Sequence, residues 1–280
     1  MEEDQVFKMP LIGDQAPNFT AVTTKGTITF SDYAKDKWVV MFSHPADFTP
    51  VCTTEMSGFA ERKSEFTALN AELMGLSIDS IHAHLAWVNN VRERTGVYFD
   101  FPIIADLDMK VSKLYGMLQP NESETAAVRA VFFIDPKKKI RLIMYYPLNV
   151  GRNMDEILRV LEALQTADAN SVALPLNWKK GDKVIVPPPK TLDEMQQRLD
   201  DTSYEKIDFY LCKKELYLKS LSIERLFNLF ISCQSVILYL RNVMGYQCFL
   251  KDIYDQKDAN HEKAYNIPIY STSYCSLYEL

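Results

Sequence analysis

Apolar runs alternate with helical patterns along the first part of the chain, and this alternation constrains the fold more than any other feature. The strand candidates are residues 38–43, 73–78, 103–105, 130–135 and 141–146. A helical pattern follows each of the first three, whereas the last two are joined by a turn at Pro136-Lys137-Lys138-Lys139. Strand–helix units favour parallel pairing and a hairpin pairs antiparallel. We therefore expect an α/β fold with a mixed central sheet and helices on both faces.

A further helix is expected to begin after Asn153, which stands at an N-cap position with Glu156 three residues later, as in a capping box. Beyond residue 166 the composition changes and prolines become frequent. The segments expected there are a short strand at 183–186, a stiff proline linker at 187–189, and a small helix and strand within 192–210. These patterns predict a second, small C-terminal domain.

The run from His44 to Glu55 is the segment that says most about function. It follows the apolar strand 38–43 and places Cys52 in the first turn of a helix. Free backbone N–H groups and the helix dipole favour the thiolate there, and the thiolate is the nucleophilic form of cysteine. A lone cysteine is more often a small buried apolar side chain. Here Thr49 is placed to aim a hydroxyl at the sulfur or at a bound oxygen, and Pro45 stiffens the loop, which favours a reactive cysteine.

This run resembles the active-site motif of the peroxiredoxins. Its ending, Pro50-Val51-Cys52-Thr53-Thr54-Glu55, is similar to the 1-Cys, peroxiredoxin-6-like branch. Three further segments resemble the same family in the same order: Arg129 to Pro136, Tyr146 to Asn153, and Asn177 to Asp182. Several ordered motifs are a stronger signal than one short pattern. The resemblance spans about residues 9 to 216 and implies a thioredoxin-like fold.

The resemblance also implies how the chain is divided. Residues 1–166 are expected to form a thioredoxin-like peroxidase domain, and residues 167–216 a C-terminal domain used for dimerisation and carrying a resolving segment. Residues 217–280 resemble nothing in the family, and we expect a helical or partly disordered extension. Its apolar run, 226–240, is shorter than the ~20 residues that a membrane span needs.

Members of this family attack a peroxide with a cysteine thiolate and form a sulfenic acid. The resemblance implies Cys52 as the nucleophile, acting on hydrogen peroxide and organic hydroperoxides. It also implies that Arg129 and Thr49 bind the peroxide and that Pro45 shields the sulfur. The fixed charge and forked donors of Arg129 suit a leaving oxygen. Three residues are expected to support the site. His44 is favoured as a structural hydrogen-bonding partner, with weak tuning of the site as the alternative. Glu55 is expected as a first-turn capping acid that also bonds an arginine, and Arg152 as part of a charge cluster.

The sulfenic acid must be reduced, and the sequence leaves two routes open. In a 1-Cys enzyme a thioredoxin-like or small-thiol reductant acts directly. In archaeal-type relatives a C-terminal cysteine forms a disulfide with the peroxidatic one, and Cys212 resembles that residue, which implies a Cys52–Cys212 bond. Those relatives often carry another cysteine where this chain has Leu218. The family resemblance further implies a homodimer that assembles into a ring such as a decamer.

Composition and charge limit which partners, cofactors and locations we expect for the protein. A net charge of −6 gives no basic face for nucleic acid. The acidic start, Met1-Glu2-Glu3-Asp4, is followed by no apolar stretch, so we expect no signal peptide, no membrane partner and a cytoplasmic location. His82 and His84 are two residues apart and face different sides of a helix, so we predict no metal, and no cofactor is implied. A non-enzymatic alternative stays open: an oligomeric holdase chaperone or redox-relay scaffold.

Overall fold

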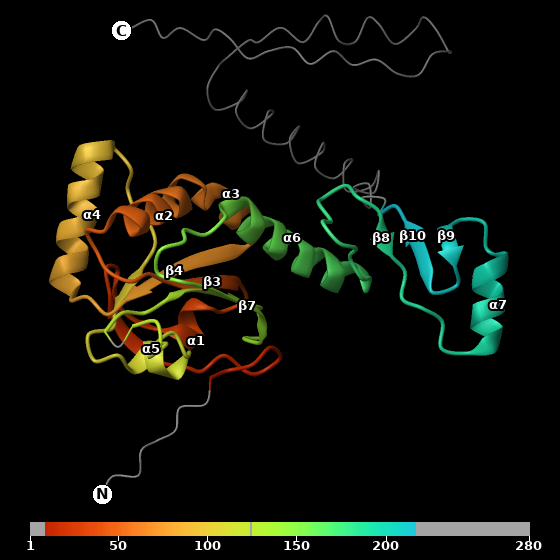
Figure 1. The fold of residues 1–280 in the computed structure, drawn as a ribbon, viewed down its shortest axis with the longest axis horizontal. Coiled ribbons are helices and arrows are strands. Elements are labelled where there is room, and N and C mark those ends of the chain that lie inside the picture. The colour runs from red at the N-terminus through yellow and green to blue at the C-terminus, as the bar shows by residue number, and fades with distance from the viewer. Residues whose placement is uncertain (1–8, 124, 217–280) are drawn as a thin grey trace, which may run out of the picture. The chain divides into compact units, whose positions relative to one another are not determined.

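The computed structural model describes residues 9–123 and 125–216, and every structural statement below concerns these residues. A seven-stranded sheet is built from strands between Thr20 and Tyr146 (Figure 1). Its strands are β1 (Thr20–Thr23), β2 (Gly26–Thr29), β3 (Trp38–Ser43), β4 (Ala71–Ser77), β5 (Ile103–Ala105), β6 (Arg129–Ile134) and β7 (Ile140–Tyr146). Their order is β2-β1-β5-β4-β3-β6-β7, and β3, β4 and β5 pair in parallel while the other neighbours are antiparallel. The expected mixed sheet is therefore confirmed.

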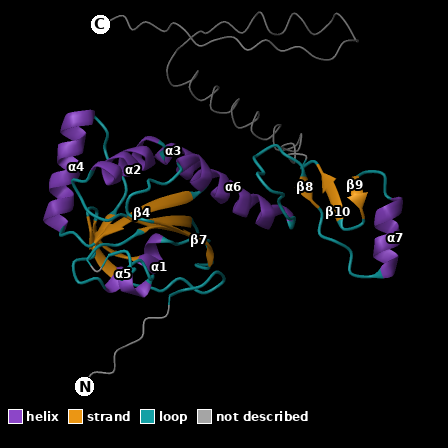
Figure 2. Ribbon diagram, in the orientation of Figure 1, coloured by secondary structure: helices purple, strands orange, loops and turns teal. Residues whose placement is uncertain are grey.

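Helices cover both faces of this sheet (Figure 2). They are α1 (Phe30–Tyr33), α2 (Pro50–Glu61), α3 (Lys63–Ala68), α4 (Ile81–Thr95), α5 (Lys110–Leu114) and α6 (Met154–Asn170). Successive residues of β3 point to opposite faces. Val40 and Phe42 belong to the core with α2, α3, α4 and α6, whereas Val39 and Met41 belong to the core with α1 and α5. All of β3 is buried, so the centre of the sheet leads directly into the loop that begins at His44.

The sequence locates the central strands but misses the start of the sheet. The expected strands 38–43 and 103–105 agree with β3 and β5. The sequence does not predict the short hairpin of β1 and β2, because its threonine-rich strands are partly exposed and carry no apolar run. Gly26 adopts a φ of 93° in its turn, a conformation that glycine reaches without a steric penalty. The helix that carries Cys52, α2, ends at Glu61, and a separate short helix, α3, begins at Lys63.

The N-terminus of α6 bears out half of the expected capping box. The Oδ1 atom of Asn153 accepts the backbone N–H of Glu156 at 3.1 Å. The carboxylate of Glu156 pairs with Arg159 on the same helix instead of reaching back to the cap residue. A charged partner one turn away offers a stronger bond than a backbone N–H group, which explains why the reciprocal half of the motif is not formed.

Beyond α6 the described chain forms a second, three-stranded antiparallel sheet with one helix. Its elements are β8 (Val184–Ile185), α7 (Leu192–Asp200), β9 (Glu205–Asp208) and β10 (Leu211–Lys214). β10 is the central strand of this sheet and carries Cys212. The sequence does not indicate this strand. The expected extension at 217–280 lies outside the described residues. Within the described part of the chain, no helix is long and apolar enough to cross a membrane.

Candidate active site

Cys52 lies in the first turn of α2, and its side chain is fully buried. Thr49 is the N-cap residue, and Pro50 opens the helix at a position where the missing N–H of proline removes no hydrogen bond. The backbone N–H groups of Val51 and Cys52 fall among those that an α-helix leaves without intrahelical acceptors. The sulfur therefore lies near the positive end of a helix of 12 residues.

Arg129, the first residue of β6, lies against this sulfur. Its Nη1 donates to Cys52 Sγ at 3.3 Å and to Glu55 Oε2 at 2.7 Å. Its Nε and Nη2 both donate to the carbonyl oxygen of Leu148, at 2.9 and 2.6 Å. These bonds fix the plane of the guanidinium, which is 3% exposed. The fold thus brings together two residues that the family resemblance placed in one site.

Glu55 is the anion that holds two arginines. Arg152 donates to it from N, Nε and Nη2, each at 2.8 Å, and from Nη1 to the carbonyl oxygens of Ser43 and Ala130, each at 2.9 Å. The expected helix-capping role of Glu55 is not what the structure shows, because charge-assisted bonds from the guanidinium groups engage its carboxylate. Burial alone would raise the pKa of Glu55, but the pairs with Arg152 and Arg129 outweigh it and hold that pKa below its usual range.

The charges of this cluster do not cancel by themselves. Arg129 and Arg152 carry two positive charges, and Glu55 supplies one negative charge between them. One positive charge remains beside the sulfur, and an anionic sulfur or a developing oxyanion would balance it. The side chain of Arg152 is 1% exposed and bonds Glu55 and two backbone carbonyls, whereas Arg129 is the arginine that contacts the sulfur of Cys52.

The loop before Cys52 departs in one detail from expectation. The hydroxyl of Thr49 donates to the carbonyl oxygen of Ala46 at 2.8 Å, so it is left to accept, and not to donate, a further hydrogen bond. Pro45 lies half-buried at the start of the loop. Phe48 has a φ of 56°, an uncommon conformation for a non-glycine residue, so tertiary contacts and not local preference hold the loop.

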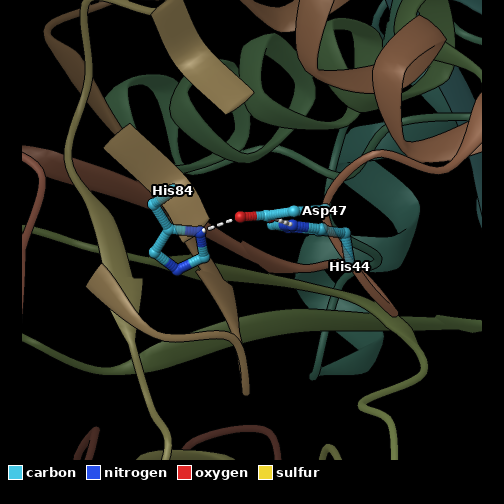
Figure 3. A group of neighbouring side chains, drawn as sticks. All are labelled: His44, Asp47 and His84. Carbon is cyan, nitrogen blue, oxygen red and sulfur yellow. Dashed lines mark hydrogen bonds and ion pairs between the residues drawn. The ribbon is translucent and has the colours of Figure 1, made fainter. Parts of the chain in front are cut away.

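His44 belongs to a buried trio that sequence reasoning misses. Its Nε2 lies 2.9 Å from Asp47 Oδ1, and His84 Nδ1 lies 2.7 Å from Asp47 Oδ2 (Figure 3). The spacing His44-x-x-Asp47 is a sequence signal for the first contact. No such signal exists for His84, because it comes from α4 and lies far from Asp47 along the chain. One possible metal-ligand atom from each residue of the trio lies within 4.8 Å of the others, and hydrogen bonds to Asp47 engage His44 Nε2 and His84 Nδ1. The absence of a metal stays a prediction.

Cys212 is buried in the second sheet. Its sulfur donates to the carbonyl oxygens of Asp208 at 3.4 Å and Phe209 at 3.7 Å. Cys52 and Cys212 are both free thiols in this structure. A resolving role for Cys212 therefore stays a prediction.

Comparisons with known proteins agree with this geometry. A family model described as the AhpC/TSA family matches residues 12–143, and one described as the C-terminal domain of 1-Cys peroxiredoxin matches residues 163–202. A peroxiredoxin of Methanosarcina mazei is 52% identical over 215 residues, which cover 74% of this chain and 98% of that protein. Peroxiredoxin 2 of Caldanaerobacter subterraneus is 54% identical over 209 residues, which cover 74% of this chain and 94% of that protein.

Solved structures lead to the same family. A structure of the yeast mitochondrial 1-Cys peroxiredoxin, described as resolving its thiol through glutathione and thioredoxin systems, is 46% identical with a TM-score of 0.67 and covers 74% of this chain and 100% of its own. A cysteine-to-serine mutant of peroxiredoxin 6 from Arenicola marina is 34% identical with a TM-score of 0.68, at 75% and 100% coverage. The thioredoxin-like fold is confirmed. The chain belongs to the peroxiredoxin family, in its 1-Cys, peroxiredoxin-6-like branch, and is an antioxidant enzyme that reduces peroxides with thiol reductants.

Proposed function

We propose that Cys52 is the peroxidatic nucleophile and that Arg129 binds the peroxide. The observation that carries this proposal is the 3.3 Å contact between Arg129 Nη1 and Cys52 Sγ. Attack of the thiolate on ROOH forms the S–O bond and breaks the O–O bond. The products are a sulfenic acid and, after uptake of one proton from water, the alcohol or water ROH. Arg129 places a fixed cation where the leaving oxygen gains negative charge.

The neighbouring residues have supporting parts in this proposal. Thr49, whose own proton is engaged by Ala46, accepts the hydrogen bond of the peroxide O–H group. Pro45 shields the thiolate from water, and the N–H groups at the start of α2 stabilise the leaving oxygen. Glu55 and Arg152 hold the guanidinium of Arg129 in place.

The second half of the cycle needs a thiol. Its attack on the sulfenic acid releases water and forms a mixed disulfide, and a second thiol then frees Cys52. The yeast relative is described as using glutathione and thioredoxin systems, and we propose the same two reductant classes here. The alternative route, a disulfide with Cys212, needs local opening because both sulfurs are buried.

The division of the chain, its assembly and its location are proposals of the same kind. The matches at 12–143 and 163–202 support a peroxidase domain at 1–166 and a C-terminal domain at 167–216, followed by the extension at 217–280. Family members form oligomers, and we propose a homodimer that closes into a ring such as a decamer, acting in the cytoplasm. The holdase or relay-scaffold alternative is not favoured, because the matched proteins are peroxiredoxins.

The test compares Cys52→Ser with Cys212→Ser in the full chain. Peroxide consumption is followed with dithiothreitol as electron donor, and circular dichroism verifies that both variants fold. Cys52→Ser should abolish turnover, whereas Cys212→Ser should keep it because dithiothreitol can reduce the sulfenic acid directly. Turnover near the wild-type rate in a folded Cys52→Ser protein would sink the proposal. A client-aggregation assay on the same variant tests the holdase alternative separately.

A further inference from the structure

The buried trio of His44, Asp47 and His84 contains protons that the proposed chemistry does not use. His44 follows β3, Asp47 lies in the loop that leads to Cys52, and His84 projects from α4 (Figure 3). Both histidine side chains are 0% exposed and the aspartate side chain is 2% exposed. Every hydrogen bond they make is therefore sheltered from water, and the available donors and acceptors determine where the protons lie.

His84 faces acceptors on both ring nitrogens. Its Nε2 lies 3.1 Å from the carbonyl oxygen of Ile104, which can only accept, so Nε2 carries a proton. Its Nδ1 lies 2.7 Å from Asp47 Oδ2. Burial alone would raise the pKa of Asp47, but the bonds from His44 and His84 outweigh it and keep that pKa below its usual range. Both ring nitrogens of His84 therefore face acceptor oxygens, an arrangement that a ring with a proton on each nitrogen satisfies in full.

His44 has only one acceptor. Its Nε2 donates to Asp47 Oδ1, whereas its buried Nδ1 has no hydrogen-bond partner among the described residues. A buried imidazolium needs an acceptor for each of its two N–H groups. The carbonyl oxygen of Ile104 is the second acceptor for His84, and His44 has no equivalent one among the described residues. Burial first, and then the charges of His84 and Arg152, lower the pKa of His44 despite the pull of Asp47. The centroids of the two rings lie 6.2 Å apart, so a positive charge on one ring disfavours a positive charge on the other.

We propose that His84 and Asp47 are positioning residues for the peroxidase reaction, because they hold His44 as the neutral Nε2–H tautomer, with a lone pair on Nδ1, in the segment leading to Cys52. This proposal rests on Cys52 being the peroxidatic residue. Asp79 is the other charged group in contact with the trio, since its carboxylate accepts the backbone N–H of Asp47 at 3.0 Å. The positive charge is thereby kept on the ring from α4, which bonds the loop at Asp47, and not on His44.

The consequence for the reaction follows from removing that charge. In His84→Gln the carboxylate of Asp47 keeps its negative charge but loses its cationic partner. The pKa of His44 should then rise by about one unit or more, the scale for a unit charge at this separation. A proton on His44 then replaces the charge lost from residue 84, so the cation moves to the residue that begins the Cys52 loop and the acid limb of the oxidation rate should shift.

The test reads the protons directly. Full-length protein labelled with ¹⁵N-histidine and kept reduced is examined by long-range ¹H–¹⁵N correlation near neutral pH, and His→Gln variants assign the four histidines. We expect both nitrogens of His84 to be protonated, and His44 to carry a proton on Nε2 only. A neutral His84, or a His44 proton on Nδ1, overturns the proposal. This reading needs no variant at residue 84 once the signals of His44, His82 and His261 are assigned.

Kinetics then separate positioning from mere support. Stopped-flow oxidation is measured against pH in His84→Gln and in the matched control His82→Gln on the same helix. A shifted acid limb in the first variant alone supports the proposal, whereas an equal loss of rate at every pH overturns it. Stoichiometric zinc that is lost in Asp47→Asn would also overturn it. Turnover that survives Cys52→Ser refutes the proposed function and leaves the NMR assignment of the protons intact.

Discussion

Replacing Arg152 with methionine should lower the free energy of unfolding by about 3–5 kcal/mol, the usual cost of removing one partner from a buried ion pair. The side chain of Arg152 is 1% exposed and makes two bonds to Glu55 and two to backbone carbonyls, at 2.8–2.9 Å. The backbone N–H of residue 152 makes a third bond to Glu55, which methionine keeps. Methionine fills a similar volume but leaves the carboxylate with only Arg129 as a cationic partner. Since typical domains are stable by about 5–15 kcal/mol, the loss is large enough to measure. Urea unfolding of the reduced protein, followed by tryptophan fluorescence, gives the value.

Two controls make this measurement decisive. The double variant Glu55→Gln/Arg152→Met removes the orphaned carboxylate, so it should be more stable than the sum of the single losses by about 1–3 kcal/mol. The matched control Arg62→Met breaks two more exposed pairs, with Glu65 and Asp155, and should cost about 1 kcal/mol or less. If Arg152→Met costs no more than Arg62→Met, Arg152 is not an energetic anchor of the site and the reasoning fails.

Three further predictions concern the same site. Arg129→Ala should slow oxidation of Cys52 in stopped-flow experiments by about 10²-fold or more, and Arg129→Lys should recover only part of the lost rate. An unchanged rate in Arg129→Ala would contradict peroxide binding by Arg129. If Cys212 resolves the sulfenic acid, peroxide should give a dimer on a non-reducing gel that disappears in Cys212→Ser, and a monomeric sulfenic acid in wild type would favour 1-Cys chemistry. The lowered folded pKa of Glu55 means that its stabilising contribution is full above about pH 4.5 and is lost as the pH falls through that folded pKa. Urea titrations above pH 4.5 and at a more acidic pH check this. Between the two, wild type should lose more unfolding free energy than Glu55→Gln does.

The central sheet could be predicted because its strands are buried on both faces. Every residue of β3 is buried, so an uninterrupted apolar run marks its position in the sequence. β1 and β2 leave no such signal. They form because Thr23 pairs with Ile104 of β5 and because Gly26 permits the turn, and the first of these causes exists only in the assembled fold.

The candidate site shows the same limit. Cys52 and Arg129 stand in motifs, so the sequence alone indicates them. His84 contributes through one contact with Asp47, which depends on how α4 packs against the loop, and no local spacing encodes that contact. The helix position of Glu55 predicts a cap, yet its partners come from β6 and from the loop before α6. Local sequence patterns suggest which hydrogen-bond partners a residue can have, and charged residues from distant elements determine which partner it takes.

Cys52 lies between two buried carboxylates, Asp47 before it and Glu55 after it, and each is held by groups from distant elements. The chain between them has little local preference for its shape, since Phe48 adopts a positive φ. A buried carboxylate that loses its partner is costly, so both anchors must hold while the helix start stays closed. A reductant thiol reaches the buried sulfur only when that start opens. We therefore expect the free energy of the two anchors to control the second half-reaction, and Arg129 and the helix terminus to control the first.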